Sequence, residues 1–561
     1  MRELKKIFTI ICITGLVAAC NLDYFPSDES TAGALRDSYN GLVYATDGNY
    51  SMFKDPLEYK GTTSSSYSYL RRQYEMAEYP SDEIVVSGRT TSTLFQAYTY
   101  ERNASLQNVS YVWWSGYKII YGANFVIDAI ENGTSEKLDY LKGENLFLRA
   151  IVHLQLVNLY AKPYSYGREN PGIVIRNSSV IQNTERASVG EVYDQIEKDL
   201  TDAIKLMQHG IRRGNAGYAS KEAAQGLLTR VYLHMGKCQE VIDLVDEMLD
   251  GATAESKLES TGNFPNYFKN ALNSKETLWA VAMTTYDSQG QSNIGSMYLN
   301  DGIGWGEVFS SDSMNDLYEK NPNDIRYGFV LPQYLDETKW MIRYPMPGTD
   351  YRDARSNNII DVQKDLTNQF YFMDDNNQKI TIQTENVEGY TKHFIMLNGI
   401  KTQVRLTKKM QHRNSFPLYY ITKYSYQDGD PMLSSPVMIR WAEVILNRAE
   451  AYANIPGKES NALADVNIIR NRAGLSGNQL FSTSNMQGYN NALDVVLDER
   501  HLELAFEGHR TLDVYRNKKN LNREYAGVHT WEIINYNDNK VIYPIPFDEI
   551  SVSGIAQNPD Y

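Results

Sequence analysis

Cysteine is scarce in this chain. The 561 residues contain three, at Cys12, Cys20 and Cys238. Cys12 lies inside an N-terminal export signal and Cys20 lies at its end, so Cys238 has no partner for an intrachain disulfide in the mature protein. A chain of this length does not need a disulfide, because it can bury a large core. We interpret Cys238 as a small, half-buried hydrophobic residue and not as a nucleophile.

Positive charge, histidine and catalytic motifs are also in short supply. Lys and Arg number 55 against 69 Asp and Glu, and the net charge of −14 argues against a nucleic-acid ligand. The 8 histidines are scattered, without the spacing of paired metal ligands. The sequence lacks GxSxG, HExxH, P-loop and Rossmann glycine motifs, and the acidic turns at 373–379 and 428–431 lack the alternating ligands of a calcium loop. We therefore predict no enzyme activity, no cofactor and no metal site.

Apolar runs of membrane-spanning length are missing, and the one apolar run near the N-terminus is short. Residues 7–17 follow three basic residues and are too few to cross a bilayer as a helix, which is typical of an export signal. The residues Val-Ala-Ala that precede Cys20 resemble a bacterial lipobox, in which Cys20 is lipidated and becomes the first mature residue. An ordinary secretory signal with a chance cysteine is the alternative. We predict a lipoprotein signal at 1–19 and a lipid-anchored tether at 20–40.

Tyrosine, in contrast, is abundant. The chain has 42 tyrosines and 7 tryptophans but 17 phenylalanines. A tyrosine combines a flat apolar face with a hydrogen-bonding tip. This combination suits sugars, which present C–H faces and hydroxyls, and it equally suits large hydrated protein interfaces. The excess of tyrosine alone does not choose between them.

Amphipathic helices dominate two parts of the chain. Apolar residues three or four positions apart predict helices over 115–131, 143–161, 189–207 and 221–249, the third beginning at a capping box formed by Ser188 and Glu191. The pair within 221–249, with a turn at Gly236, resembles a degenerate tetratricopeptide unit. A second pair, which begins at Met438, recurs around the Pro456-Gly457 turn. Such hairpins, expected at about 110–250 and 437–516, must stack to bury their apolar faces.

The region between the two helical parts, 251–436, has a different pattern. It is rich in Asn, Asp, Gly, Pro and Tyr, with short strand-like runs such as 394–397 and 419–421. It is too long for a connecting loop. We predict an irregular, loop-rich layer on a mainly α scaffold, within a single domain that spans 41–561, and such layers commonly hold binding sites.

Several motifs, in order along the chain, are those of one family. They are GENLFLRAIVHLQLVNLYAKPYS (143–165), RASVGEVYDQIEKDLTDAI (186–204), ASKEAAQGLLTRVYLHMGK (219–237), IRWAEVILNRAEAYA (439–453), ADVNIIRNRAGL (464–475), LDERHLELAFEGHRTLDVYR (497–516) and YPIPFDEISVSGIAQNPDY (543–561). Together with LDYFP (22–26), they resemble the SusD/RagB family of outer-membrane glycan-binding lipoproteins. The resemblance implies an α fold on four tetratricopeptide-like hairpins, and a surface location on the outer membrane. It also implies a SusC-like TonB-dependent transporter as partner, covered by the lipoprotein as a lid.

Three carboxylates of the 497–516 motif invite a catalytic interpretation. Glu499, Glu503 and Glu507 recur every four residues, and glycoside hydrolysis uses a pair of carboxylates. Carboxylates at this spacing lie side by side on one helix, however, and not across a substrate. We therefore predict a buried network of ion pairs. We likewise interpret Tyr543 to Pro546 as an extended structural plug.

A glycan site needs an exposed aromatic platform with polar neighbours. The resemblance implies its location, in the loops before the first long helices and after the second hairpin. The second location contains Trp305 between two glycines, and the first contains the segment TDGNY at 46–50. A tryptophan packed inward and an Asx-type turn are the respective alternatives. The candidate glycan-binding residues are Trp305, Tyr298, Tyr286, Asn300, Asp301, Asp47, Asn49, Arg355 and Tyr390, while Trp113, Trp114, Trp279 and Trp441 are expected in the core.

Two classes of function are compatible with these features. The first is a non-catalytic lipoprotein that captures an oligo- or polysaccharide at the cell surface and delivers it to the transporter. The second is a peptide- or protein-binding helical-repeat lipoprotein of a nutrient importer. The aromatic loops favour a glycan.

Overall fold

The computed structural model describes residues 32–88, 93–180, 185–210, 212–345, 357–387, 390–529 and 533–561. The predicted signal, Cys20 and the first part of the predicted tether lie outside these ranges. The chain divides into two units, residues 1–45 and 46–561. The described part of the first unit holds α2 (Ala32–Arg36) and the beginning of α3 (Tyr39–Lys54), so the end of the predicted tether is helical.

The helices of the second unit follow the predicted apolar stripes. The long ones are α6 (Gln107–Ala129), α7 (Glu136–Tyr160), α8 (Val189–Leu206), α9 (Lys221–Met235), α10 (Cys238–Leu249), α13 (Trp441–Ala453), α14 (Glu459–Arg472) and α15 (Ala492–Glu503). The shorter ones are α4 (Tyr69–Glu78), α5 (Thr93–Thr99), α11 (Gly295–Tyr298), α12 (Asp312–Glu319), α16 (Arg510–Arg516) and α17 (Phe547–Ser553). Each of the described helices is too short or too polar to cross a bilayer.

Local signals set the helix ends. The capping box before α8 forms as predicted, because the Ser188 hydroxyl accepts from the Glu191 amide at 3.2 Å and the Glu191 carboxylate accepts from the Ser188 amide at 2.8 Å. Gly236 ends α9 in the left-handed conformation, with a φ of 73°. Met438 belongs to a strand and not to the predicted helix, because α13 begins at Trp441.

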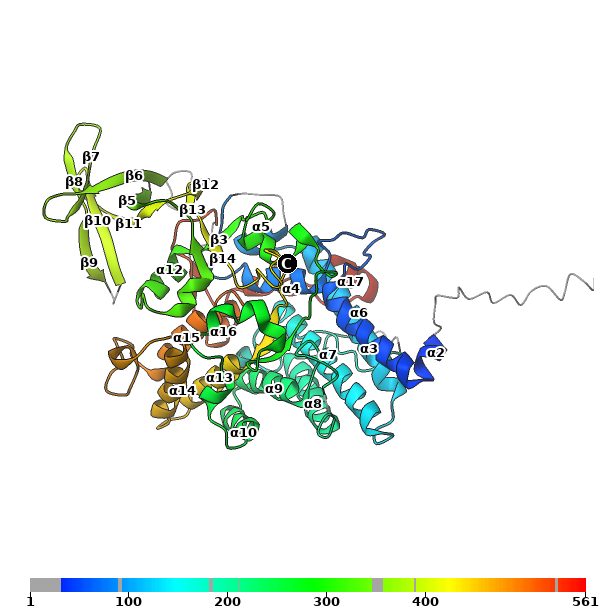
Figure 1. Ribbon diagram of the computed structural model, residues 1–561. Coiled ribbons are helices and arrows are strands. Elements are labelled where there is room, and N and C mark those ends of the chain that lie inside the picture. Colours follow the sequence, from blue (N-terminus) through cyan, green and yellow to red (C-terminus); the bar gives the residue numbers. More distant parts are fainter. Residues whose placement is uncertain are drawn as a thin grey trace, which may run out of the picture. The chain divides into compact units, whose positions relative to one another are not determined.

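The long helices form one continuous array (Figure 1). Helix α7 packs between α6 and α8, α8 packs on α9, and α9 and α10 pack on α13, which packs in turn on α14 and α15. Their apolar faces meet in a large common core, and Cys238 at the start of α10 is half-buried, as predicted. The mainly α, tetratricopeptide-like fold class is confirmed.

The region 251–436 contains more regular structure than the sequence indicated. The predicted strands at 394–397 and 419–421 are present, but a seven-stranded antiparallel sheet also occupies 334–410, in the order β8-β7-β6-β5-β11-β10-β9. Its strands are β5 (Tyr334–Pro345), β6 (Asn357–Lys364), β7 (Phe370–Met373), β8 (Lys379–Thr381), β9 (Gln383–Val387), β10 (Tyr390–Leu397) and β11 (Ile400–Met410). The loop-rich layer is therefore partly a sheet.

The sheet has a small core of its own and a charged attachment to the helical part. Its core side chains are Ile342, Tyr344, Val362, Phe372, Ile382, Ile395 and Val404. Arg343 and Arg405 of the sheet form ion pairs with Asp312 and Asp316 of α12, and Lys392 pairs with Asp316 at 2.6 Å. These pairs connect the sheet to the helix that lies beside it in Figure 1.

Short two-stranded ladders complete the strands of the described residues. The pairs are β1 (Ile84–Val86) with β3 (Val308–Ser310), β2 (Thr277–Ala280) with β15 (Val437–Arg440), β4 (Val330–Pro332) with β14 (Tyr419–Ile421), β12 (His412–Arg413) with β13 (Phe416–Pro417), and β16 (Leu521–Asn522) with β17 (Ile533–Ile534). Two of these pairs, β1 with β3 and β2 with β15, connect the 251–436 layer to segments outside it.

The predicted network of ion pairs is present and buried. Glu503 pairs with Arg440 at 2.5 Å, with Arg326 at 3.2 Å and with Arg472, and all four side chains are at most 3% exposed. Glu499 pairs with Arg326 at 2.7 Å. Burial opposes the charge on Glu503, but the arginines outweigh it and hold the pKa of Glu503 well below its usual value. One detail of the prediction is wrong: α15 ends at Glu503, so the third carboxylate lies beyond the helix.

The C-terminal plug is also present. Tyr543 donates its amide to the Leu159 carbonyl at 2.8 Å and its hydroxyl to the Met76 carbonyl at 3.0 Å. The Asn558 side chain donates to the Tyr543 carbonyl at 2.7 Å, which holds the C-terminal segment on the end of α7.

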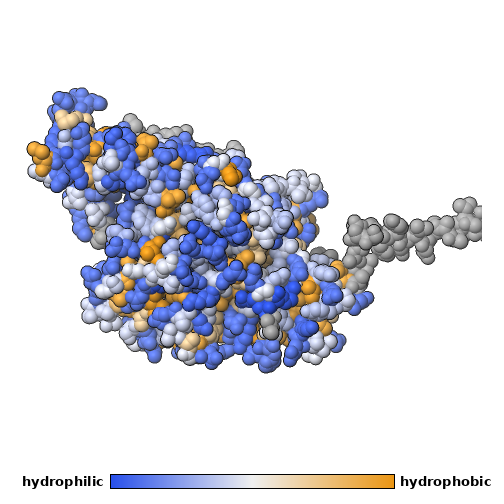
Figure 2. All heavy atoms as spheres, in the orientation of Figure 1, coloured by the Kyte–Doolittle hydropathy of each residue, from blue (hydrophilic) through white to orange (hydrophobic). Residues whose placement is uncertain are grey.

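Figure 2 shows one face of the molecule as largely hydrophilic, with hydrophobic residues in small scattered groups.

Candidate functional site

Trp305 stands exposed in a tightly held turn. Its side chain is 46% exposed, and its indole Nε1 donates to the Gln291 carbonyl at 3.2 Å. Gly304 has no room for a side chain, because a Cβ there would lie 2.0 Å from the Leu299 carbonyl oxygen, and Gly306 has a φ of +49°. The flanking glycines therefore fix the turn instead of loosening it, and the alternative of an inward-packed tryptophan is wrong.

Polar side chains around Trp305 support its backbone and its neighbours. Arg413 donates to the Trp305 carbonyl at 2.6 Å, and Asn300 donates to the Gly304 carbonyl at 2.9 Å. Tyr426 donates to the Asp301 carboxylate at 3.2 Å, and burial followed by the Asp301 charge raises the pKa of Tyr426. We call this set the Trp305 surface: Trp305, Asn300, Asp301, Arg413 and Tyr426.

The two predicted tyrosines of the same segment have opposite environments. Tyr286 is 98% exposed, in a turn that Asp287 closes by accepting from the Thr284 amide at 2.8 Å. Tyr298 is fully buried, and its hydroxyl hydrogen-bonds that of Tyr74 at 2.7 Å. Tyr298 therefore belongs to the core beneath the turn, and its prediction as a glycan-binding residue is wrong.

The second predicted location, TDGNY, is part of a helix. It lies inside α3, so neither a glycan-binding loop nor an Asx turn forms there. Asn49 is buried and donates to the Asn145 side chain of α7 at 2.7 Å. Asp47 pairs with Arg213 at 2.9 Å, and Arg213 pairs with buried Glu144 at 2.7 Å. Asn49 is buried, so its prediction as a glycan ligand is wrong, while Asp47 keeps a side chain that is 41% exposed and stays a prediction.

The side chains of the two remaining candidates, Arg355 and Tyr390, lie outside the described part of the chain. Arg355 lies outside the described residues. Tyr390 begins β10, opposite Val387 of β9, and its side chain lies outside the described set.

A carboxylate pair with strongly shifted pKa values lies in the interior, below the 497–516 motif. Burial raises the pKa of Glu78 to about 7 and raises that of Glu83 further, and the two side chains hydrogen-bond each other. Glu83 also accepts from the Phe506 amide at 2.6 Å, and Glu78 accepts from the Gly508 amide at 2.9 Å. Both are at most 1% exposed, so the pair holds the 506–508 turn where a substrate has no access.

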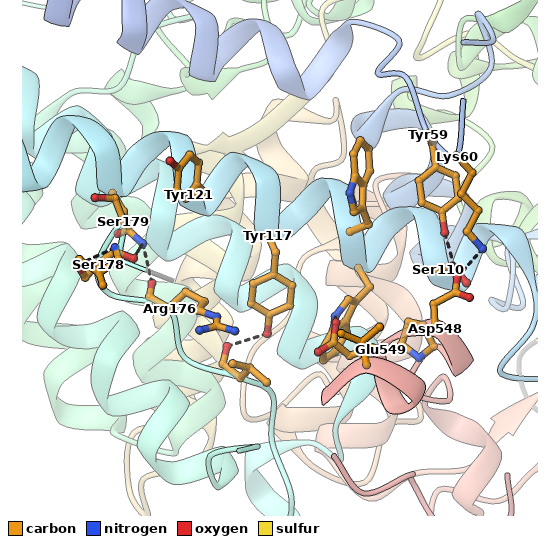
Figure 3. A pocket seen from close by; sticks show the side chains of 17 residues that line it. Tyr59, Lys60, Ser110, Tyr117, Tyr121, Arg176, Ser178, Ser179, Asp548 and Glu549 are labelled. Carbon is orange, nitrogen blue, oxygen red and sulfur yellow. Dashed lines mark hydrogen bonds and ion pairs between the residues drawn. The ribbon is translucent and has the colours of Figure 1, made fainter. Parts of the chain in front are cut away.

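Sequence reasoning missed a groove along α6. Trp113, Trp279 and Trp441 are buried as expected, but Trp114 is only half-buried and lines a groove of about 500 Å³ with Tyr117 and other residues of α6 and α17 (Figure 3). The available signal was the spacing of Trp114, Tyr117 and Tyr121, which places three large aromatic rings on neighbouring turns of one helix. Within the described ranges, His, Cys, Asp and Glu side chains do not gather into a set that could hold a metal ion.

Two family models match the chain in consecutive segments. Residues 60–233 match a model described as "Starch-binding associating with outer membrane", and residues 275–561 match the model of the SusD family. The second match alone covers more than half of the chain.

Individual proteins agree with the family models. The chain is 24% identical over 464 residues to "SusD-like protein P2" of Formosa agariphila, covering 81% of each sequence. It is similar in structure to a SusD superfamily protein from Bacteroides thetaiotaomicron, with a TM-score of 0.69 and 21% identity over 93% of this chain and 99% of that one. A "Laminarin binding SusD-like protein" aligns with a TM-score of 0.55 and 20% identity over 96% of this chain and 100% of that one.

Proposed function

The chain belongs to the SusD family, and from that premise we propose that it captures a glycan at the cell surface without cleaving it. The observation that carries this proposal is the Trp305 ring, which is held by its own indole hydrogen bond and by flanking glycines, yet remains 46% exposed. An aromatic face that is fixed before binding loses little entropy when a sugar stacks on it.

The polar partners of the Trp305 surface suit sugar hydroxyls. Asp301 and Tyr426 lie together, and the Arg413 side chain is 40% exposed while it supports the Trp305 carbonyl. Carboxylate, phenol and guanidinium groups supply both acceptors and donors for hydroxyl groups. The matching family model described as starch-binding and the structurally similar laminarin-binding protein support a glycan over a peptide as the ligand.

A non-catalytic role is supported by where the carboxylates lie. The Glu499 and Glu503 carboxylates are engaged by buried arginines, and the Glu78–Glu83 pair is inside the protein. Hydrolysis of a glycosidic bond requires two carboxyl groups on opposite sides of an accessible substrate. We therefore expect wild-type protein to release no reducing ends from a glycan that it binds.

The experiment is a glycan-array screen of the soluble chain, begun at Asn21, followed by calorimetric titration of the best ligand. We expect dissociation constants between about 1 µM and 1 mM, which correspond to about 4–8 kcal/mol. Trp305→Ala should weaken binding by at least about 1 kcal/mol, and Trp305→Phe, which keeps a ring, should weaken it less. Equal glycan affinity of wild type, Trp305→Ala and Trp305→Phe would show that the site does not include Trp305. Binding of peptides and of no glycan would favour the peptide-import function.

We also propose lipid anchoring through Cys20 and delivery to a SusC-like TonB-dependent transporter. A capture protein needs a transporter because it has neither a pore nor an energy source. After mild-detergent extraction with a tag at Tyr561, wild type should co-purify a large outer-membrane β-barrel, and Cys20→Ala should no longer partition with membranes. Unchanged partitioning of Cys20→Ala would contradict the lipobox, and wild type recovered without a barrel would contradict the transporter partnership.

A further inference from the structure

The groove along α6 has an aromatic wall with a regular repeat. Trp114, Tyr117 and Tyr121 follow one another at three and four positions, so each ring lies about one helical turn, 5.4 Å, beyond the last. Tyr121 is 50% exposed, while Trp114 and Tyr117 are half-buried. Lys118 lies over the Trp114 ring with its ammonium 5.0 Å from the centroid, and its side chain is exposed to solvent.

Internal contacts hold two rings of this wall, Trp114 and Tyr117, in place. The Tyr117 hydroxyl donates to the Val174 carbonyl at 2.7 Å. Tyr59 is buried against Trp114, with the ring centroids 5.1 Å apart. Trp113 packs against Tyr117 with centroids 5.0 Å apart. Trp114 and Tyr117 are therefore held in place without a ligand, and Tyr121 extends the wall as an exposed ring.

Polar groups gather at both ends of the aromatic wall, as Figure 3 shows. At one end, Ser178 and Ser179 donate their hydroxyls to Asp128 at 3.1 and 2.8 Å. At the other end, Asp548 of α17 pairs with Lys60 at 2.5 Å, and both side chains remain more than half exposed. Hydroxyl, carboxylate and ammonium groups thus flank the rings, within reach of the groove between them.

The charges of the lining indicate a neutral ligand. Lys60 and Arg176 are balanced by Asp548 and Glu549. An anionic glycan would need an excess of basic side chains, and a cationic peptide would need an excess of acidic ones. The wall belongs to helix α6, whose backbone N–H and C=O groups are hydrogen-bonded within the helix. It therefore offers no exposed strand edge with which an extended peptide could pair.

We infer that the α6 groove is a second glycan-binding site that takes a neutral oligosaccharide, its sugar rings stacked on Trp114 and Tyr121. The inference rests on the proposed glycan-binding function but not on its location, because the lining of the groove and the Trp305 surface have no residue in common. The volume of about 500 Å³ lies within the range of small-molecule sites, which suits a short stretch of a longer chain. Two separate sites on one molecule would raise the avidity for a polysaccharide.

The test uses four neutral probes: maltohexaose, cellohexaose, laminarihexaose and xylohexaose. Each is titrated into wild type, Trp305→Ala, Tyr121→Ala and the double variant, and hydroxyl-radical footprinting reports the accessibility of Trp114 and Trp305. With at least one probe, we expect Trp114 of wild type to be protected from the radicals. We also expect Trp305→Ala to retain some binding of that probe, and the double variant to bind it at least about fivefold more weakly than Trp305→Ala. Tyr121→Phe should keep this binding, because it retains the ring. Tyr44→Ala is the matched control, since Tyr44 is an exposed helical tyrosine outside the groove.

The possible failures are distinguishable. A probe that binds with protection of Trp305 alone, and with Tyr121→Ala equal to wild type, would overturn the groove assignment and leave the proposed function intact. Loss of binding in Tyr121→Phe to the same extent as in Tyr121→Ala would also overturn stacking. Protection of Trp114 by a proline-rich peptide, where all four sugars leave it accessible, would reassign the groove to peptides. Wild type that binds none of the probes and no glycan of the array would overturn both proposals.

Discussion

The 499–513 segment and the 291–306 segment use polar chemistry in opposite ways. In the first, Glu503 and its arginine partners are at most 3% exposed, and each charge meets an opposite charge. In the second, hydrogen bonds fix the backbone around Trp305 while the ring itself stays exposed. The density of charge therefore marks where this protein is held together, and an exposed, immobilised aromatic ring marks where we expect it to bind.

The largest effect should come from breaking the buried network. Glu503→Ala leaves three buried arginines short of a carboxylate, and we expect the free energy of unfolding to fall by about 3–5 kcal/mol. Urea denaturation provides the measurement. The matched control is Asp202→Ala, which removes an exposed ion pair with Lys198 and should cost less than about 1 kcal/mol. Similar losses in the two variants would contradict the structural role of the network.

The pH dependence of stability should reveal the Glu78–Glu83 pair. Burial raises the folded-state pKa of Glu78 to about 7, above its ordinary value near 4.5. Its stabilising contribution is therefore complete below about pH 4.5 and is lost as the pH rises through 7. We expect wild type to lose on the order of 1–3 kcal/mol relative to Glu78→Gln between about pH 4.5 and 7, because the amide does not ionise. Parallel stability profiles of the two proteins in urea denaturation would exclude a shared proton in this pair.

The smallest effect on stability should come from the exposed aromatic ring. Trp305→Ala removes a side chain that is nearly half exposed, and we expect its unfolding free energy to stay within about 1 kcal/mol of wild type. The same variant should lose glycan affinity, as proposed above. Thermal or urea denaturation measures the first quantity. A loss of several kcal/mol would mean that Trp305 is a structural residue, which would remove the contrast between the two segments.

The helical part of the fold was predictable from the sequence because its signals are local. Apolar residues recur at helical spacing in α6 to α10, and the Ser188 capping box and Gly236 mark helix ends as expected. The network of charges was predictable from the spacing of Glu499 and Glu503 in a familiar motif. Its arginine partners, such as Arg326, come from distant segments, and only the fold shows which of them meet.

The seven-stranded sheet was missed although one local signal for it was present. Asn398 and Gly399 both have positive φ and join β10 to β11 in a two-residue turn, and Asn-Gly between strand-like runs is a strong hairpin signal. The strands themselves are largely polar, since β9 is exposed along its whole length, so their hydrophobic pattern is weak. The pairing of β5 with β11, which closes the sheet between strands far apart in the sequence, has no local signal.

The candidate site was only partly predictable, because exposure depends on what packs nearby. Trp305 and Tyr286 are exposed, but Tyr298, only seven residues from Trp305, is buried by Tyr74 and Tyr424. Asp47 and Asn49 resemble loop residues by type, yet they lie on a helix that contacts α7. The groove beside Trp114 forms only where α17, from the far end of the chain, meets α6.

The most direct test of the central claim is a crystal structure of the wild-type protein with the best glycan of the array. We predict an intact oligosaccharide with one ring stacked on the exposed face of Trp305 and with hydroxyls paired to Asp301 or Arg413. A cleaved glycan, or an intact one bound away from both Trp305 and the α6 groove, would contradict the account.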